Sequence, residues 1–177
     1  IKRRGVQFTS AGTGIFHSEF NNNPDVPVHF LQVWIRPATM DLEPTYTTSS
    51  WTDEQKKNRL CRILSQNGKD SSIIINCDVE VFASILEENK SIEYSLGPGR
   101  IGYLHLADTG GKLKIRNRAS SDETVELSGG DGVFISPGAA LEIIGGSQEG
   151  QSEFLFFDMN ESQRQLCRES SDSDDSF

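Results

Sequence analysis

The sequence predicts an all-β protein of the jelly-roll type, an antiparallel sandwich or barrel. Three observations indicate this class: strand-length runs of β-favouring residues follow one another along the chain, turns containing Gly or Pro separate them, and strands do not alternate with helices. The last observation argues against a doubly wound α/β fold. A chain of 177 residues is long enough for one sizeable domain or two small ones.

A strand is expected from Val28 to Ile35, eight residues of mainly β-favouring type that end before Pro37. Residues at alternate positions of a strand point to opposite faces. Both faces of this segment are largely apolar, so we expect the strand to lie in the middle of a sandwich. One face carries His29, Leu31, Val33 and Ile35, and the other carries Val28, Phe30, Gln32 and Trp34.

The polar stretch from Ala38 to Ser50 contains Pro44 and is predicted to be a linker. A capping-box pattern follows, with Thr52 three residues before Gln55, and predicts the start of a short helix. Where this helix ends stays open, because residues 60–64 fit both a helical stripe and an alternating strand.

Nine more strands are expected from Ile73 onward, each bounded by turn residues such as Gly97-Pro98-Gly99 and Pro137-Gly138. Their even spacing is typical of a sandwich or barrel. The expected strands are Ile73–Cys77, Val79–Leu86, Ser91–Leu96, Ile101–Ala107, Lys112–Asn117, Thr124–Leu127, Gly132–Ile135, Ala140–Ile144 and Glu153–Asp158.

Charge and composition exclude two classes of partner. The net charge of −9 disfavours nucleic acid, and no stretch approaches the roughly 18 consecutive apolar residues that a membrane helix needs. Three widely spaced cysteines, Cys61, Cys77 and Cys167, form no disulfide framework and indicate a reducing compartment such as the cytoplasm. Residues 161–177 form an acidic tail that is predicted to be disordered and is interpreted first as a solvated segment that keeps the protein soluble. The alternative is a regulatory role, since its serines beside Asp residues suit an acidophilic kinase.

The most informative side chains are His17 and Glu19 in the stretch Ser-Ala-Gly-Thr-Gly-Ile-Phe-His-Ser-Glu. On a strand these two residues project from one face while Ser18 points to the other. An imidazole nitrogen beside a carboxylate oxygen makes half of a mixed site suited to Fe, Mn, Ni or Zn. The spacing alone is a weak signal, since most such pairs are solvated or hydrogen-bonded to each other.

The same stretch resembles the pirin family, a branch of the cupin superfamily that includes bacterial quercetin-dioxygenase-like proteins. The resemblance is carried by residues 10–21 (SAGTGIFHSEFN) and residues 27–35 (PVHFLQVWI), followed by Pro37. It implies a bicupin, which is two jelly-roll barrels in one chain, with the first cupin incomplete here.

In this family one metal ion, usually iron, lies in the first cupin, held by two histidines of an upstream H-x-H motif and by the His and Glu of H-S-E. The resemblance therefore implies His17 and Glu19 as metal ligands and iron, or another divalent transition metal, as the cofactor. No H-x-H is present in the printed chain, so we expect the pair to precede Ile1 and the chain to be N-terminally truncated. We accordingly expect this chain alone to hold metal poorly or not at all. His29 and His105 are interpreted as packed or hydrogen-bonded strand residues.

Residues 130–141 resemble the second cupin motif, in which a His follows the Pro-Gly turn. Leu141 stands at that position and cannot ligate a metal, so the resemblance implies a structural second cupin without metal. Asp131 and Glu142 are the carboxylates left nearby, and we expect turn and surface roles for them.

The expected organisation is the C-terminal part of the first cupin (1–48), a linker with a short helix (49–70), a second cupin lacking metal ligands (71–160) and the acidic tail (161–177). Two functions remain open. One is a quercetinase-like dioxygenase acting on a small aromatic, flavonol-like substrate, with Glu19 also serving as the catalytic base. The other is a non-catalytic, iron-dependent co-regulator of transcription in the nucleus that binds protein partners; a metal-free structural remnant is a further possibility. The residues Thr13, Ser18 and the run Phe30-Leu31-Gln32 resemble the bacterial quercetinase-like branch more closely.

Overall fold

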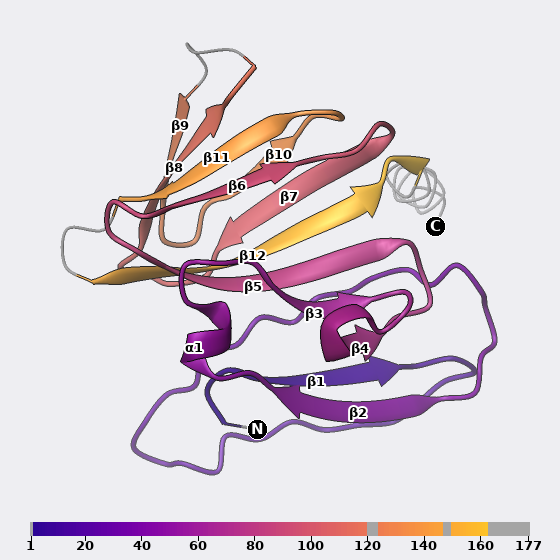
Figure 1. Cartoon of the computed structure of the whole chain (residues 1–177). Coiled ribbons are helices and arrows are strands. Elements are labelled where there is room, and N and C mark those ends of the chain that lie inside the picture. The colour runs from indigo at the N-terminus through magenta and orange to yellow at the C-terminus, as the bar shows by residue number, and fades with distance from the viewer. Residues whose placement is uncertain (1, 120–123, 147–149, 163–177) are drawn as a thin grey trace, which may run out of the picture.

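The computed structural model describes residues 2–119, 124–146 and 150–162 of the chain. Two larger sheets face each other, and a separate two-stranded sheet lies against the outer side of one of them (Figure 1). Within the described residues, the helical elements are α1 (Asp53–Lys56) and the short 3₁₀ turn η1 (Lys69–Ser71). The all-β class predicted from the sequence is confirmed. None of these helices has the length and apolar character needed to cross a membrane.

Six strands form the larger sheet in the order β10-β7-β12-β5-β3-β4, and four form the smaller sheet in the order β6-β11-β8-β9. Neighbouring strands are antiparallel except for β3 and β4, which are parallel. The strands of the larger sheet are β3 (Cys61–Ser65), β4 (Ile73–Ile74), β5 (Val79–Glu87), β7 (Arg100–Leu106), β10 (Gly132–Ile135) and β12 (Gln151–Asn160). Those of the smaller sheet are β6 (Ser91–Ser95), β8 (Lys112–Asn117), β9 (Thr124–Ser128) and β11 (Ala140–Gly145).

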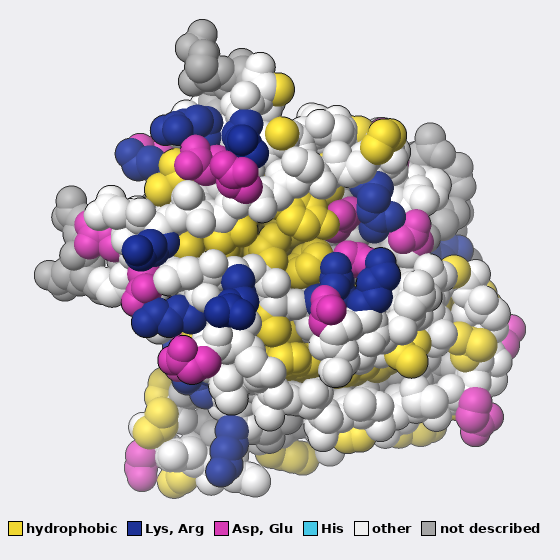
Figure 2. All heavy atoms as spheres, viewed as in Figure 1, with side chains coloured by type: hydrophobic (Ala, Val, Ile, Leu, Met, Phe, Trp, Pro, Cys, Tyr) yellow, Lys and Arg dark blue, Asp and Glu magenta, His cyan; other side chains and the backbone are white. Residues whose placement is uncertain are grey.

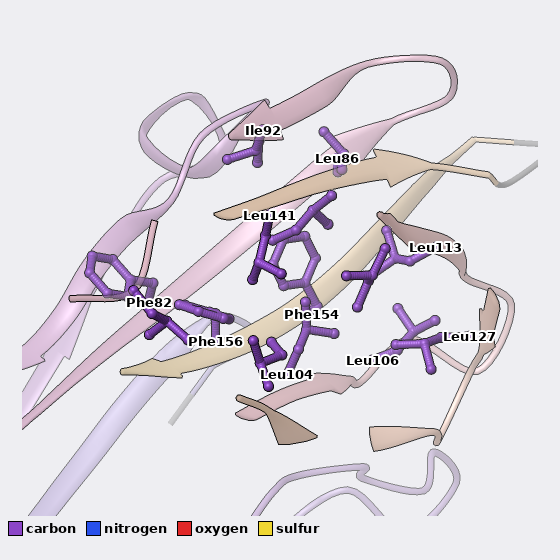
Figure 3. Close-up of a cluster of buried hydrophobic side chains, with 14 residues drawn as sticks. Phe82, Leu86, Ile92, Leu104, Leu106, Leu113, Leu127, Leu141, Phe154 and Phe156 are labelled. Carbon is purple, nitrogen blue, oxygen red and sulfur yellow. The ribbon is translucent and has the colours of Figure 1, made fainter. Parts of the chain in front are cut away.

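All nine strands expected from Ile73 onward are present, although β4 has only two residues. Alternate side chains of the two sheets point into the space between them and fill it (Figure 3). Phe154 and Phe156 of β12 and Leu104 of β7 pack there with Leu141 of β11, and all four are at most 3% exposed. Burying one such side chain stabilises the fold by about 1.5–3 kcal/mol relative to leaving it in water.

The outer face of the larger sheet is covered by the two-stranded sheet of β1 (Gly5–Ser10) and β2 (Thr45–Ser50), which lies below it in Figure 1. Val6 and Phe8 of β1 pack against a second buried cluster that includes Trp51. The capping box is formed as predicted: the backbone N–H of Thr52 donates to Gln55 Oε1 at 2.8 Å, and the backbone N–H of Gln55 donates to Thr52 Oγ1 at 3.4 Å. The helix ends at Lys56, so the ambiguous residues that follow belong mainly to β3.

Two predictions for the N-terminal part are wrong. Residues 11–44 contain no strand, so the strand expected from Val28 to Ile35 is not formed, and the predicted linker at 38–50 contains β2. A strand needs a neighbour that pairs with its backbone N–H and C=O groups, and an apolar pattern alone does not provide one. The strands β1 and β2 were not predicted because the apolar alternation in β1 (GVQFTS) is limited to Val6 and Phe8, and β2 (TYTTSS) is almost entirely polar.

Candidate functional site

His17 and Glu19 both lie exposed in the irregular segment of residues 11–44, which contains no strand or helix. The shared strand face predicted for them is therefore not formed, because neither residue belongs to a strand. The Glu19 carboxylate instead accepts a hydrogen bond from the side-chain amide of Gln7 on β1. Their role as metal ligands stays a prediction.

A tight turn at Gly12 and Gly14 leads into this pair. Gly12 has a φ of +51°, and the N–H of Gly14 donates to the carbonyl of Ala11 at 2.8 Å. A Cβ at position 12 would lie 1.8 Å from the carbonyl oxygen of Leu42, so only glycine fits. The N–H of Thr13 donates to that same carbonyl at 3.0 Å, so a hydrogen bond joins the two ends of the segment 11–44.

The segment leaves an unusual amount of apolar surface in water. Trp34 is 84% exposed and Phe20 is 82% exposed. Contiguous apolar surface on a folded protein usually marks a place where another structure packs. The other exposed apolar side chains between residues 15 and 46 are Ile15, Phe16, Val26, Val28, Phe30, Leu31, Val33, Met40 and Tyr46.

The remaining histidines do not join the pair. His29 is exposed in the same segment, and His105 lies on β7, where its ring stacks on Tyr103 with centroids 6.5 Å apart. The packed-strand interpretation therefore describes His105 but not His29, since no strand forms at residue 29. Across the described parts of the chain, no three His, Cys, Asp or Glu side chains gather in a group that could hold a metal ion.

In the two facing sheets, the positions near the Pro-Gly turn have structural roles. Leu141 is 3% exposed and belongs to the apolar core, where the motif otherwise has a histidine. Asp131 Oδ2 accepts a hydrogen bond from the backbone N–H of Ser128 at 2.8 Å, and Glu142 pairs with Arg116 at 3.0 Å. The turn and surface roles expected for Asp131 and Glu142 are confirmed.

A polar network that the sequence did not reveal links the two facing sheets at one end. Asp158 is 5% exposed, and its carboxylate accepts hydrogen bonds from the Tyr94 hydroxyl, at 2.5 Å, and from Arg100 Nε. Arg100 also donates to Asp78 Oδ1 at 2.9 Å. Burial and the hydrogen bond to Asp158 raise the pKa of Tyr94 above its ordinary value. The only hint in the sequence is that Asp158 occupies an inward position of the strand pattern.

A second ion-pair group lies beside this network. Burial opposes ionisation of Glu80, but a hydrogen bond from Lys69 and the charge of Arg62 bring its pKa below the ordinary value. The Arg62 guanidinium also lies 5.0 Å from the centre of the Phe82 ring. A cleft of about 360 Å³ runs between these groups and the loop after β3. Figure 2 shows one face of the molecule, with apolar side chains at its centre and charged side chains around them.

Cys61 and Cys77 are free thiols. Cys77 is fully buried, and burial raises the pKa of its thiol to about 11. A thiol with such a pKa is inert near neutral pH, so Cys77 has a packing role. Cys167 and most of the acidic tail lie outside the described residues.

Comparison with known proteins connects both parts of the chain to one family. A family model described as the quercetinase C-terminal cupin domain matches residues 62–159, and the model for pirin matches residues 1–35. A putative quercetin 2,3-dioxygenase of Pasteurella multocida is 30% identical over 86% of this chain and 60% of its own length. Quercetin 2,3-dioxygenase of Escherichia coli is 28% identical over the same shares of the two chains.

Solved structures agree with these relatives. The structure of the bacterial pirin YhhW from Escherichia coli in complex with nickel(II) has a TM-score of 0.74 and 25% identity, covering 89% of this chain and 62% of its own. Another structure of YhhW has the same TM-score, with 27% identity over 86% of this chain and 59% of its own. The chain thus spans about 60% of the length of the relatives that it matches. On the strength of the quercetinase-type match to more than half of its residues and of this shared jelly-roll fold, the chain belongs to the pirin family of cupin proteins.

Proposed function

We propose that the chain forms the second cupin and the last part of the first cupin of a pirin-type, metal-dependent dioxygenase acting on a flavonol-like substrate. The observation that carries this proposal is the His-Ser-Glu sequence at 17–19, which lies inside the stretch matched by the pirin model. The names of the Pasteurella and Escherichia relatives support the same reaction and substrate class.

The exposed apolar segment supports the incomplete first cupin. The segment from Val28 to Ile35 has the composition of a central strand but no paired neighbour in the described chain, and Trp34 is 84% exposed. Further strands from outside the printed residues would pair with this backbone and cover both of its faces. The same strands would bring the two missing histidines beside His17 and Glu19.

The residues present do not make a complete metal site. His17 offers an imidazole nitrogen and Glu19 a carboxylate oxygen, which is two of the four ligands that the family resemblance implies. A first-row metal held by the full set would supply Lewis acidity and electron transfer toward O₂. Within this chain, the contribution of Gln7 is to orient the Glu19 carboxylate through their hydrogen bond.

A chimera tests the activity. The part of the Escherichia coli relative that this chain does not match would be joined to residues 1–177 and loaded in turn with Fe(II), Mn(II), Ni(II) and Co(II). We expect the chimera to consume O₂ with quercetin, and we expect Glu19→Gln to slow turnover about 100-fold or more, as for loss of a catalytic base. A folded, metal-loaded chimera that consumes no O₂ with any of the four metals would contradict the dioxygenase proposal and leave the non-catalytic co-regulator as the alternative.

A further inference from the structure

The cleft beside Asp158 lies between two walls of different structure. One wall is formed by strands β5, β7 and β12 of the larger sheet, at the end where β5 begins and β12 ends (Figure 1). The other wall is the loop after β3. The cleft holds about 360 Å³, and small-molecule sites usually hold about 300–1,000 Å³. It therefore has room for one small organic molecule.

The strand wall carries charged side chains that are already fixed in position. Asp158 is 5% exposed and accepts a hydrogen bond from Arg100 Nε, while Arg100 Nη1 donates to Asp78 Oδ1 at 2.9 Å. Arg62 Nη2 donates to Glu80 Oε2 at 3.1 Å. A buried ion pair adds little net stability compared with apolar side chains of the same volume. A few fixed polar groups in a cleft are instead typical of a ligand site, because a preorganised site loses little entropy on binding.

The loop wall has strained backbone. Gly68, Asp70 and Ser71 have φ values of +64°, +54° and +62°, and the last two carry a Cβ that disfavours this conformation. Such strain persists only where the surrounding structure enforces it, and it is found especially at ligand clamps and active sites. Lys69, between these residues, donates to Glu80 Oε1 at 3.1 Å and so joins the loop to the strand wall. The loop is therefore held in an unfavourable conformation at the edge of the cleft.

The charges in the cleft indicate that its ligand is neutral. Lys69 pairs with Glu80, and Arg100 pairs with both Asp78 and Asp158. A charged ligand would place a like charge beside one member of these pairs and would compete with the other member. A neutral ligand leaves the pairs intact. It can still bind, because Arg100 keeps N–H groups that its three hydrogen bonds do not use and the carboxylates keep free lone pairs.

The remaining hydrogen-bonding capacity of the cleft also indicates the chemistry of the ligand. A hydroxyl group donates and accepts at once, so one hydroxyl can donate to a carboxylate and accept from a neighbouring cation. Gln66 and Asn67 add exposed amides on the loop wall, and their side chains make no hydrogen bond within the described part of the chain. An amide likewise offers both donors and an acceptor.

We propose that this cleft binds a small, neutral, polyhydroxylated molecule of the size of one sugar ring. Its hydroxyls are recognised by Arg100 and Asp78 on the strand wall and by Asn67 on the loop wall. The site is independent of the proposed dioxygenase activity and of the His17–Glu19 pair.

NMR titration of the ¹⁵N-labelled full chain tests the site and its preference for a neutral ligand. The neutral probes are glucose, galactose and mannose. Glucuronate and glucosamine keep the same ring but carry a negative and a positive charge, respectively, at about pH 6. We expect saturable shifts of the amides of residues 66–71 and of Glu80 with at least one neutral sugar, and binding of both charged sugars weaker by about fivefold or more.

Asn67→Ala tests the contact with the loop wall without disturbing the ion pairs. It should weaken binding of the neutral sugar about threefold or more, as for loss of one hydrogen bond. The matched control is Asn22→Ala, because Asn22 is also an exposed amide but lies in segment 11–44, outside the cleft. Its affinity should stay within about 1.5-fold of that of the unchanged chain.

Three results would overturn the proposal. The first is that no neutral sugar gives saturable shifts at residues 66–71. The second is that a charged sugar binds the cleft as tightly as the neutral ones. The third is unchanged affinity in an Asn67→Ala variant that is folded by circular dichroism.

Discussion

Two buried serines illustrate how partners decide the effect of a hydroxyl on stability. Ser84 on β5 is 2% exposed, and its Oγ has no hydrogen bond. Ser152 on β12 is fully buried, but its Oγ donates to the carbonyl of Lys112 at 2.8 Å and accepts from the N–H of Lys112 at 3.0 Å. The two side chains therefore have the same chemistry and similar burial but opposite hydrogen-bonding states.

We expect opposite outcomes when each serine is replaced by alanine. Ser152→Ala removes the acceptor of the Lys112 N–H and one donor to the Lys112 carbonyl, which keeps the hydrogen bond from the N–H of Gly146, and should lower the free energy of unfolding by about 1–3 kcal/mol. Ser84→Ala removes an unpaired polar group, so the same quantity should stay unchanged or rise by up to about 1 kcal/mol. Urea denaturation of the two variants measures both changes. A larger loss for Ser84→Ala than for Ser152→Ala would contradict the hydrogen bonding described.

At the scale of elements, the network around Asp158 joins strand β12 to two strands, β6 and β7, that lie far from it in sequence. Tyr94 lies on β6, Arg100 on β7 and Asp158 on β12, so the network bridges the smaller and the larger sheet at one end of the barrel. Arg100 Nη2 also donates to the backbone carbonyl of Asp158 at 2.9 Å. A buried carboxylate held in this way depends strongly on its cation.

Replacing Arg100 with Met should therefore lower the free energy of unfolding by about 3 kcal/mol or more, because Asp158 is left buried without its counter-charge. The matched control is Arg116→Met, which breaks an exposed pair with Glu142 and should cost about 1 kcal/mol or less. Denaturant unfolding of both variants checks the difference. Equal losses would show that the Arg100 network is no more important than a surface ion pair.

The elements that could be predicted from sequence are those whose neighbours lie within the chain. Strands β4 to β12 combine β-favouring residues with Gly and Pro turns, and their partners are all present. Residues 28–35 have an equally strong apolar pattern but form no strand. Such a pattern shows which residues can be buried in a sheet, but it does not show whether a neighbouring strand is present to pair with them. The His17–Glu19 pair came from family resemblance, whereas the Arg100–Asp158 pair needed the topology, since 58 positions separate the two residues.

At the scale of the whole molecule, two carboxyls beside the cleft make stability depend on pH. Burial opposes ionisation of both groups. A hydrogen bond from Arg100 nevertheless brings the pKa of Asp78 below its ordinary value of 3.8. A hydrogen bond from Lys69 likewise brings the pKa of Glu80 below its ordinary value of 4.5. A carboxyl with a lowered pKa stabilises the fold above its unfolded-state pKa, and this contribution is lost as the pH falls through the lower, folded-state pKa. We therefore expect stability to be held down to about pH 5 and to fall below about pH 4.

Thermal unfolding across this pH range checks the expectation. Glu80→Gln should flatten the acid-side loss of Tm, since one of the responsible carboxyls is gone. Glu88→Gln is the control, because Glu88 is exposed and makes no ion pair in the described part of the chain. If Glu80→Gln and Glu88→Gln retain the same pH profile, Glu80 does not contribute to the acid response.

The most direct test of the metal half-site is calorimetric titration of Ni(II) into the chimera described above and into its His17→Ala and His29→Ala variants. His29 is the matched control, because it lies exposed in the same segment but outside the ligand set that the resemblance implies. We predict one tight Ni(II) site, weakened about tenfold or more by His17→Ala and less than twofold by His29→Ala. Undiminished Ni(II) affinity in the His17→Ala variant would contradict the assignment of this residue as a metal ligand.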